Sequence, residues 1–298
     1  MSASPPIVVT GAAGFIGRRT VTRLAQAGCR VWALDRVPWP GEPLAGVEHG
    51  CVDLATDAPR VAEGTLVHLA WNMARADAAG QTQALADFQR LLSAGSWRGV
   101  VGLGSAEEYG DLAGRLHEDQ APGPLLSAYG QAKFAAGQAL AAWARAANRK
   151  AVWLRPFVVY GPGQGGSMAI PFALRCARER IPGDFSAGHQ LRDFVHVDDV
   201  VAGIVAATLG LPALKTSWTV CNLGRGEPVR LRDVLERIAE LTQATELFRF
   251  GVRPMRSNEP PEQVADVATA AAVLGWRAQI SWQQGIAELC KATMELRG

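Results

Sequence analysis

Ile7-Val-Val-Thr-Gly-Ala-Ala-Gly-Phe-Ile-Gly17 decides the fold, because it joins a short apolar run to three glycines spaced Gly-x-x-Gly-x-x-Gly at the start of a helical pattern. Such glycines let the chain turn tightly and let backbone N–H groups approach a pyrophosphate without a Cβ in the way. The helix that follows offers the partial positive charge of its N-terminus to phosphate. The stretch therefore predicts a strand, a loop and a helix that bind a dinucleotide, with contacts from Gly11, Gly14, Phe15, Ile16 and Gly17.

Short apolar runs separated by longer helical stretches continue outward from this loop. Buried parallel strands are predicted at four further runs: 30–34, 65–69, 99–103 and 151–154. Helices are predicted at about 15–27, 78–95 and 127–148, the last with Ser127 as its N-cap. Strands separated by helices of this length form right-handed βαβ crossovers, so we predict an α/β fold with a doubly wound, Rossmann-like parallel sheet.

The composition shifts after residue 160 toward proline and glycine, as in Gly161-Pro-Gly-Gln-Gly-Gly166. The second half predicts helices at about 231–242, 266–274 and 282–296, while the β-rich run 194–222 predicts a return to the sheet. We therefore expect a dinucleotide-binding domain over 1–165 that also includes 194–222. Residues 166–193 and 223–298 are expected to form a smaller, mixed α/β lobe that binds substrate.

Tyr129 and Lys133 lie four residues apart in Ser-Ala-Tyr-Gly-Gln-Ala-Lys, and Ser105 provides a hydroxyl upstream. Residues four apart share one face of a helix. A lysine ammonium near a phenol stabilises the phenolate, so we expect the pKa of Tyr129 to fall below its ordinary value of about 10. The three residues together predict a catalytic group that transfers a proton to or from a carbonyl oxygen.

Asp35 ends the second predicted strand about 20 residues after the glycine loop, where a carboxylate binds adenosine ribose hydroxyls and repels a 2′-phosphate. This position favours NAD over NADP. Arg18 and Arg36 favour the opposite choice, because either could neutralise a 2′-phosphate, so NADP stays possible. Asp53 follows a short apolar pair, and it could meet the adenine amino group or be an ordinary surface carboxylate.

Composition and charge argue against several other classes of protein. The chain has 298 residues, 48% of them apolar, which is enough for a large core. Thirty basic and 28 acidic residues give a net charge of +2 without a polybasic block, so we expect no nucleic-acid partner. No stretch resembles a signal peptide or a membrane span, so we expect a cytoplasmic protein without membrane contact. The five scattered cysteines lack ligand spacing, and we expect no metal.

Further motifs follow in order along nearly the whole chain, and with them the sequence resembles the extended short-chain dehydrogenase/reductases, a family of nucleotide-sugar epimerases, dehydratases and 4-ketoreductases. The motifs are Thr10-Gly-x-x-Gly-x-x-Gly17, Asp53-Leu54, His68-Leu-Ala70, Gly104-Ser-Ala-Glu-Glu-Tyr-Gly110, Tyr129-x-x-x-Lys133, Leu154-Arg-Pro-Phe-Val-Val-Tyr-Gly-Pro-Gly163, Arg192-Asp-Phe-Val-His-Val-Asp-Asp199, Asn222-Leu-Gly224 and Ala265-Asp…Leu274-Gly-Trp276. This resemblance implies the fold and a nicotinamide cofactor.

The resemblance also implies roles for single residues. Ser105 takes the catalytic hydroxyl position, Tyr129 is the general acid and base, and Lys133 binds the nicotinamide ribose. Further cofactor contacts are implied for Asp35, Arg36, Asp53, Leu54, Leu69, Ala70, Pro156 and Phe157. Substrate contacts are implied for Ser105, Glu107, Val158, Arg192 and Arg253, of which the two arginines match positions that grip a nucleotide-sugar diphosphate.

Several positions depart from the family pattern. Ala106 and Glu107 stand where dehydratases carry an Asp-Glu pair, and an alanine does not protonate a leaving hydroxyl, which disfavours dehydration. Val158 replaces an asparagine that touches the sugar diphosphate in many relatives, and Trp71 replaces a small residue. We therefore expect an altered substrate pocket.

The resemblance and these departures lead to an expected function. We expect an NAD(P)-dependent reductase of a keto group, at C4, on a nucleotide-activated 6-deoxy-hexose, with Tyr129 as general acid. The alternative is a nucleotide-sugar 4-epimerase with tightly bound NAD, and a third interpretation is a dinucleotide-sensing protein without catalysis. The Ala-rich surface of 132–147 suits close packing against the sheet or a second subunit, and we expect a homodimer.

Overall fold

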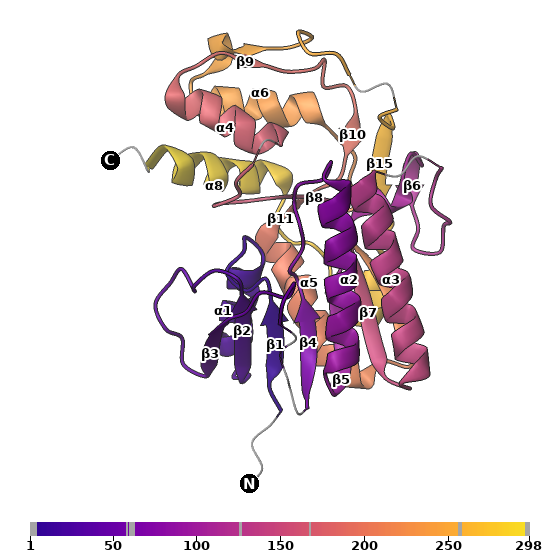
Figure 1. Cartoon of the computed structure of the whole chain (residues 1–298). Coiled ribbons are helices and arrows are strands. Elements are labelled where there is room, and N and C mark those ends of the chain that lie inside the picture. The colour runs from indigo at the N-terminus through magenta and orange to yellow at the C-terminus, as the bar shows by residue number, and fades with distance from the viewer. Residues whose placement is uncertain are drawn as a thin grey trace.

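The computed structural model of the chain describes residues 5–57, 59, 63–124, 127–166, 168–255 and 258–295. Its centre is a seven-stranded sheet in the order β12-β7-β5-β4-β1-β2-β3, in which all neighbouring strands are parallel (Figure 1). The strands are β1 (Ile7–Thr10), β2 (Val31–Asp35), β3 (Val47–Cys51), β4 (Gly64–His68), β5 (Trp97–Leu103), β7 (Lys150–Pro156) and β12 (Trp218–Leu223). The order reverses between β1 and β4, which places a ligand-binding crevice at their carboxyl ends.

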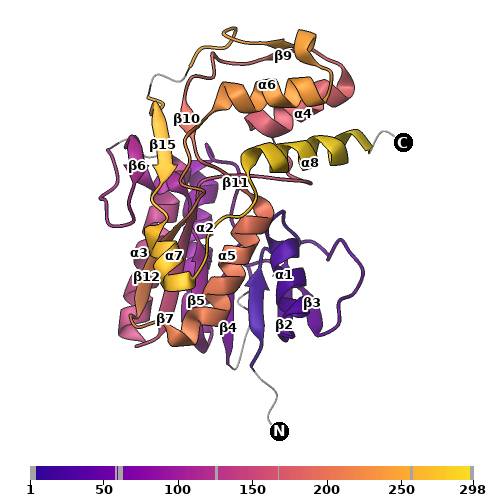
Figure 2. The same ribbon diagram turned by 180° about the vertical axis from the view of Figure 1, so that it is seen from behind.

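Helices cover both faces of this sheet. The helices α2 (Ala78–Ala94) and α3 (Ala128–Ala146) pack together on one face (Figure 1). The helices α1 (Gly17–Gln26), α5 (Val197–Gly210) and α7 (Ala268–Leu274) cover the other face (Figure 2). This arrangement confirms the predicted doubly wound α/β fold.

The central strands are apolar because both of their faces are buried. In β1, Val9 belongs to a buried cluster with side chains of α1 and α5, while its neighbour Val8 packs in a second cluster with Phe88 of α2. In β4, Val67 and Leu66 divide between the same two clusters. Successive side chains of a strand point to opposite faces, so a strand covered on both sides reads as a continuous apolar run.

A second group of elements forms a smaller lobe at one end of the sheet (Figure 1). Its helices α4 (Ala169–Glu179), α6 (Leu231–Leu241) and α8 (Trp282–Glu295) share one buried apolar cluster. Its short strands are β6 (Gly114–Leu116), β8 (Val158–Tyr160), β9 (Gly183–Asp184), β10 (Leu191–Arg192), β11 (Phe194–His196), β13 (Val229–Arg230), β14 (Phe248–Arg249) and β15 (Glu262–Ala265). The three predicted C-terminal helices are confirmed, although residue 296 lies outside the described residues. Within the described part of the chain, no helix is long and apolar enough to cross a membrane.

The stretch 194–222 differs in part from its prediction. The chain does return to the sheet, because β12 pairs with β7 at one edge. Before that strand, however, Val197–Gly210 forms α5, which the β-rich run concealed. Valines 200 and 201 and Ile204 of this helix are fully buried, so their β-branched side chains indicate burial and not a strand. The edge strand β3 was not predicted either, because it is mostly exposed and lacks an apolar run.

Candidate active site

The glycine-rich loop connects β1 to α1, and its glycines serve different purposes. Gly11 has a φ of +69°, and a Cβ on it would lie 2.6 Å from the backbone nitrogen of Ala70. A Cβ on Gly17 would lie 1.9 Å from the Gly11 carbonyl oxygen. The packing of the loop itself therefore requires these two glycines. A Cβ on Gly14 would meet only the Gly11 oxygen, at 3.1 Å, among the described residues, so this backbone is open to a ligand and fits a pyrophosphate.

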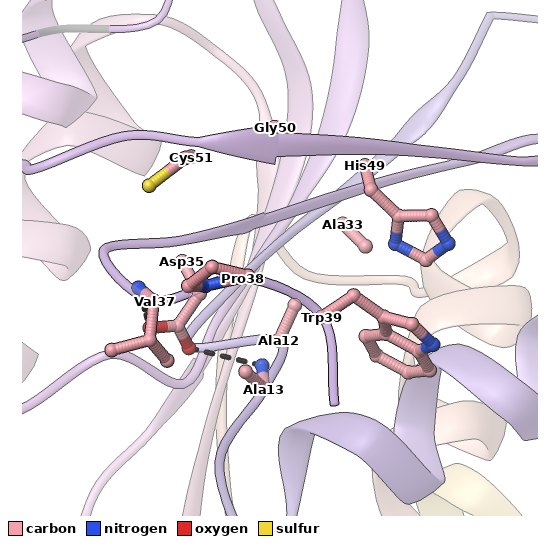
Figure 3. A pocket seen from close by; sticks show the side chains of 10 residues that line it. All are labelled: Ala12, Ala13, Ala33, Asp35, Val37, Pro38, Trp39, His49, Gly50 and Cys51. Carbon is pink, nitrogen blue, oxygen red and sulfur yellow. Dashed lines mark hydrogen bonds between the residues drawn. The ribbon is translucent and has the colours of Figure 1, made fainter. Parts of the chain in front are cut away.

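Asp35 ends β2 beside this loop and faces a cavity of about 220 Å³ (Figure 3). Its Oδ2 accepts the Ala13 N–H at 3.0 Å, and its Oδ1 accepts the Val37 N–H at 3.2 Å. The stacked rings of Trp39 and His49, 4.8 Å apart, line the same cavity (Figure 3). Carboxylate oxygens accept further hydrogen bonds, so this position fits the adenosine ribose of a dinucleotide.

The two arginines that would favour NADP are not among the residues that line this cavity. Arg36 is exposed. The Arg18 guanidinium lies beside Gly163, where a Cβ would be 2.1 Å from its Nη2. The cavity beside Asp35 therefore fits a free ribose hydroxyl better than a 2′-phosphate.

The other predicted cofactor residues follow the carboxyl ends of the central strands. Leu69 and Ala70 come directly after β4, and the Leu69 N–H donates to the Thr10 carbonyl at 3.1 Å. Pro156 ends β7, and the Phe157 N–H donates to the Leu223 carbonyl at 3.0 Å. Asp53 and Leu54 follow β3 in the same way. Parallel strands end at one edge, which places these residues along the edge that bears the glycine loop. Their contacts to a cofactor stay predictions.

Ser105, Tyr129 and Lys133 come together between the end of β5 and the start of α3. Ser105 is the N-cap of a short 3-10 helix, η1 (Ala106–Tyr109). Tyr129 and Lys133 lie one turn apart on α3, which Ser127 caps as predicted, its hydroxyl oxygen accepting a backbone N–H at 2.9 Å. The Ser105 hydroxyl lies beside the Tyr129 phenol and favours its charged form, which lowers the pKa of Tyr129. All three predicted catalytic side chains are thus buried in one place.

Lys133 is held by neighbours that the sequence did not indicate. Its Nζ donates to the Leu103 carbonyl at 2.6 Å and lies 3.9 Å from the centroid of the Trp71 ring. Burial lowers the pKa of Lys133 to about 7, and the carboxylate of Glu108 opposes that effect. The unusual Trp71 therefore covers the catalytic lysine, to which it offers a cation–π contact.

The pKa of Tyr129 differs from its prediction. Burial raises it to about 12, the Arg75 guanidinium lowers it, and the Glu107 carboxylate raises it further. The expected fall below the ordinary value is therefore wrong in this structure. The physical reason is that the phenol is 5% exposed, so the charged form loses its hydration, while Lys133 itself is largely neutral above pH 7.

Arg75 is a site residue that sequence reasoning missed. It lies between β4 and α2, and its Nη1 is 2.7 Å from Glu107 Oε1. Its guanidinium carbon lies 5.2 Å from the centroid of the Tyr129 ring. The second oxygen of Glu107 accepts the Ser127 hydroxyl at 2.7 Å. The only sequence signal for Arg75 was its place shortly after His68-Leu-Ala70.

Sequence reasoning also missed Glu108, a core residue whose side chain holds the backbone of Ser105. It is fully buried, and its Oε1 accepts the Ser105 N–H at 2.8 Å and the Trp153 indole N–H at 2.9 Å. Its Oε2 accepts the Arg155 Nε–H at 2.9 Å. Burial raises the pKa of Glu108, and the Arg155 guanidinium opposes this rise. The ion pair of Glu108 and Arg155 thus fixes the backbone of Ser105 from within the core.

Three of the predicted substrate residues, Val158, Arg192 and Arg253, lie in the lobe, whereas Ser105 and Glu107 lie at η1. Arg192 on β10 is mostly buried and forms an ion pair with Glu259 at 2.9 Å. Arg253 is exposed, and its guanidinium carbon lies 5.0 Å from the centroid of the Phe172 ring. Val158 starts β8 and packs against the apolar cluster of the lobe. Their contacts to a substrate stay predictions.

His68 is not part of the catalytic group, although it ends the strand next to it. His68 accepts or donates a 2.8 Å hydrogen bond with the Thr10 hydroxyl, and burial lowers its pKa to about 3, so it is a neutral core residue. Across the described ranges, no group of three or more His, Cys, Asp or Glu side chains could hold a metal ion.

Lys133 leads to a prediction about stability and pH. The pKa is about 7 in the folded protein against an ordinary value of 10.5, so between these values the unfolded chain binds one proton more. The free energy of unfolding should therefore rise with pH by at most about 1.4 kcal/mol per pH unit. Urea unfolding of Lys133→Met should show about 3 kcal/mol less rise between pH 7 and pH 9.5 than the wild type. If the free energy of unfolding rises equally with pH in both proteins, Lys133 does not have a lowered pKa in the folded state.

Comparisons with known proteins agree with this geometry. A model of the NAD dependent epimerase/dehydratase family matches residues 7–215. CDP-abequose synthase of Salmonella typhimurium is 32% identical over 136 residues, 45% of this chain and 45% of that protein, so the match spans less than half of this relative. GDP-6-deoxy-D-mannose reductase of Pseudomonas aeruginosa is 28% identical over 302 residues, with 94% of each chain covered.

A solved structure is similar over almost the whole chain. MoeE5 in complex with UDP-glucose and NAD has a TM-score of 0.86 and 31% sequence identity, and the match covers 98% of this chain and 100% of that one. The same sheet and lobe therefore occur together in a protein that holds a dinucleotide and a nucleotide sugar.

Proposed function

The chain belongs to the NAD dependent epimerase/dehydratase family, and within that family we propose that it reduces a keto group, at C4, of a nucleotide-activated 6-deoxy-hexose. Membership confirms the resemblance to the extended short-chain dehydrogenase/reductases, the enzymatic character and NAD as the cofactor. The observation that carries the proposal is the Ser105 hydroxyl beside the buried Tyr129 phenol, at the sheet edge that bears the glycine loop.

The chemistry follows from these residues. When NAD is bound in its reduced form, it supplies a hydride to the carbonyl carbon. Tyr129 would donate its phenolic proton to the carbonyl oxygen, and Ser105 would hydrogen-bond the same oxygen, so that the alkoxide does not develop without a partner. Lys133 keeps at least one N–H donor besides the one that binds the Leu103 carbonyl, and it would bind the nicotinamide ribose. The backbone around Gly14 and the Asp35 carboxylate would hold the other end of the cofactor.

The protonated state of Tyr129 fits the role of proton donor in a reduction. A phenol with a pKa of about 12 carries its proton at neutral pH and enters the reaction as a donor. Ala106 at the position of the dehydratase aspartate also supports a reductase over a dehydratase.

The relatives support the substrate class. GDP-6-deoxy-D-mannose reductase matches over 94% of each chain, and CDP-abequose synthase matches over part of its length. We further propose that residues 166–193 and 223–298 bind the nucleotide sugar, while 1–165 and 194–222 bind NAD. Arg192 and Arg253 would provide charge-assisted hydrogen bonds to its diphosphate. A homodimer and a cytoplasmic location stay predictions.

A nucleotide-sugar 4-epimerase is the second candidate, and a specific observation favours it. UDP-glucose 4-epimerase of Neisseria meningitidis serogroup C is 26% identical, with 92% of each chain covered. An epimerase would use Ser105 and Tyr129 twice, first to oxidise C4 and then to reduce the same carbon from the other face.

One experiment separates the two candidates. The purified protein is mixed with NADH and, in turn, with GDP-, CDP- and dTDP-activated 4-keto-6-deoxyhexoses, and separately with NAD⁺ and either UDP-glucose or UDP-glucuronic acid. We expect one NADH to be oxidised for each molecule of product from one of the keto sugars. Conversion of a UDP-sugar to its C4 epimer without consumption of NADH would identify an epimerase instead. A protein that binds NADH and converts none of these would contradict both candidates.

A further inference from the structure

The ion pair of Arg75 and Glu107 lies at the start of the helix that carries Tyr129. Glu107 Oε1 is 2.7 Å from Arg75 Nη1, and Glu107 Oε2 accepts the Ser127 hydroxyl at 2.7 Å. The same Ser127 oxygen caps α3 by accepting the Gly130 N–H at 2.9 Å. Tyr129 lies between Ser127 and Gly130 in the chain, so the pair reaches the first turn of its helix through the Ser127 side chain.

The contact between η1 and α3 is tight at this point. A Cβ on Gly130 would lie 2.6 Å from the Glu107 carbonyl oxygen, which shows how closely the two segments approach. An ordinary surface ion pair contributes little, and the side chains of Arg75 and Glu107 are 41% and 32% exposed. This pair differs because it joins three segments of the active site: the residues after β4, η1 and the first turn of α3.

Charged groups of both signs face the Tyr129 ring. The Arg75 guanidinium carbon lies 5.2 Å from the ring centroid, and the Lys133 Nζ lies 5.8 Å from it. Arg75 is the main charge that favours the phenolate, whereas the Glu107 and Glu108 carboxylates disfavour it and the Ser105 hydroxyl favours it. Lys133 is largely neutral above pH 7, but a guanidinium stays charged at every pH that a protein tolerates.

We propose that Arg75 is a positioning residue of the reaction, which provides the permanent positive charge facing Tyr129 as the phenol exchanges its proton and holds the Glu107 carboxylate at the start of α3. The catalytic part of this role rests on the proposed function. Stabilisation of the Tyr129 phenolate by a positive charge, which the sequence analysis expected from Lys133, is here assigned to Arg75. Loss of the guanidinium would leave Tyr129 beside an unopposed carboxylate, whereas loss of the Glu107 charge would leave it beside an unopposed cation.

The test measures the phenol itself and needs no substrate. The chain has three tyrosines, so labelling with ¹³C at the tyrosine Cζ gives three signals, and Tyr129→Phe identifies the one of interest. The signal is followed to the highest pH at which circular dichroism shows a folded protein. Compared with the wild type at the same pH, Arg75→Gln should have about threefold to tenfold less phenolate at Tyr129, and Glu107→Gln about threefold to tenfold more. Arg75→Lys should stay near the wild type.

Ser127→Ala is the matched structural control, because it removes the helix cap and the hydroxyl contact to Glu107 without changing any charge. Its phenolate fraction should equal that of the wild type. If the ion pair is merely structural, the phenolate fraction of Tyr129 will change in the same direction in Arg75→Gln and Glu107→Gln, or in neither variant. This result would overturn the proposal. Hydride transfer is measured separately, so opposite shifts in a protein without reductase activity would refute the proposed function alone.

Discussion

Replacement of Tyr129 by phenylalanine is expected to reduce turnover of the keto sugar by about 10²- to 10⁴-fold. The phenol supplies the proton in the proposed reaction, and phenylalanine preserves the ring while it removes that proton. Tyr129 is 5% exposed, so water does not easily take its place. The dissociation constant for NADH, measured by fluorescence titration, should stay that of the wild type, because the assigned role concerns the carbonyl oxygen and not the binding of the cofactor.

Tyr160→Phe is the matched control for this prediction. Tyr160 is buried in the lobe, and its hydroxyl makes only a long contact of 3.5 Å with the Trp282 carbonyl. This variant loses the same hydroxyl from a similar environment and should keep wild-type turnover. Comparable losses in both variants, or full activity in Tyr129→Phe, would contradict the role of Tyr129 as the general acid.

The second large effect concerns the buried pair beneath Ser105. Glu108→Gln keeps the shape of the side chain but leaves the Arg155 guanidinium without its negative partner in the core. An uncompensated buried charge destabilises a protein by about 3 to 5 kcal/mol, and we expect a loss of this size in urea unfolding. The Ser105 N–H would keep an acceptor only if the new amide presents its oxygen, so turnover should fall as well.

Glu63→Gln provides the comparison at the surface. Glu63 accepts the Arg98 Nε–H at 2.7 Å, but both side chains are about half exposed. Water solvates the remaining arginine there, so the expected loss is below about 1 kcal/mol. Equal losses for Glu108→Gln and Glu63→Gln would show that the buried pair does not hold the site together.

Much of the fold was predictable because it depends on local patterns. The run Ile7–Thr10 is apolar on both faces of its strand, and Gly11 and Gly17 are required by contacts within a few residues and with the adjacent β4 segment. The spacing of Tyr129 and Lys133 reports directly that they share a helix face. These features leave a signature in sequence because neighbouring positions cause them.

The helix α5 was missed for a related reason. Its run of valines and isoleucine satisfies the composition of a buried strand, and only its length and the acidic first turn of Asp198 and Asp199 indicate a helix. The helix is apolar on nearly all of its surface, so it lacks the polar face that would have shown a helical period. Composition therefore predicted the burial of this segment correctly and its secondary structure wrongly.

The electrostatics of the site depend on distant parts of the chain. The pKa of Tyr129 is set by burial and by Arg75, 54 positions earlier, and the Ser105 backbone is fixed by Glu108 together with Arg155, 47 positions later. Tertiary packing creates these contacts, and no local spacing encodes them. The sequence identified which groups carry the chemistry, whereas the structure shows what sets their charge.

The most direct test of the central claim follows a hydride. The protein is incubated with NADH that carries deuterium at both C4 positions and with the nucleotide-activated 4-keto-6-deoxyhexose that it converts, and the mass of the product sugar is measured. The account predicts a product that contains one deuterium from the cofactor and that forms far more slowly with Tyr129→Phe. A product without deuterium, or one formed at the same rate by that variant, would contradict it.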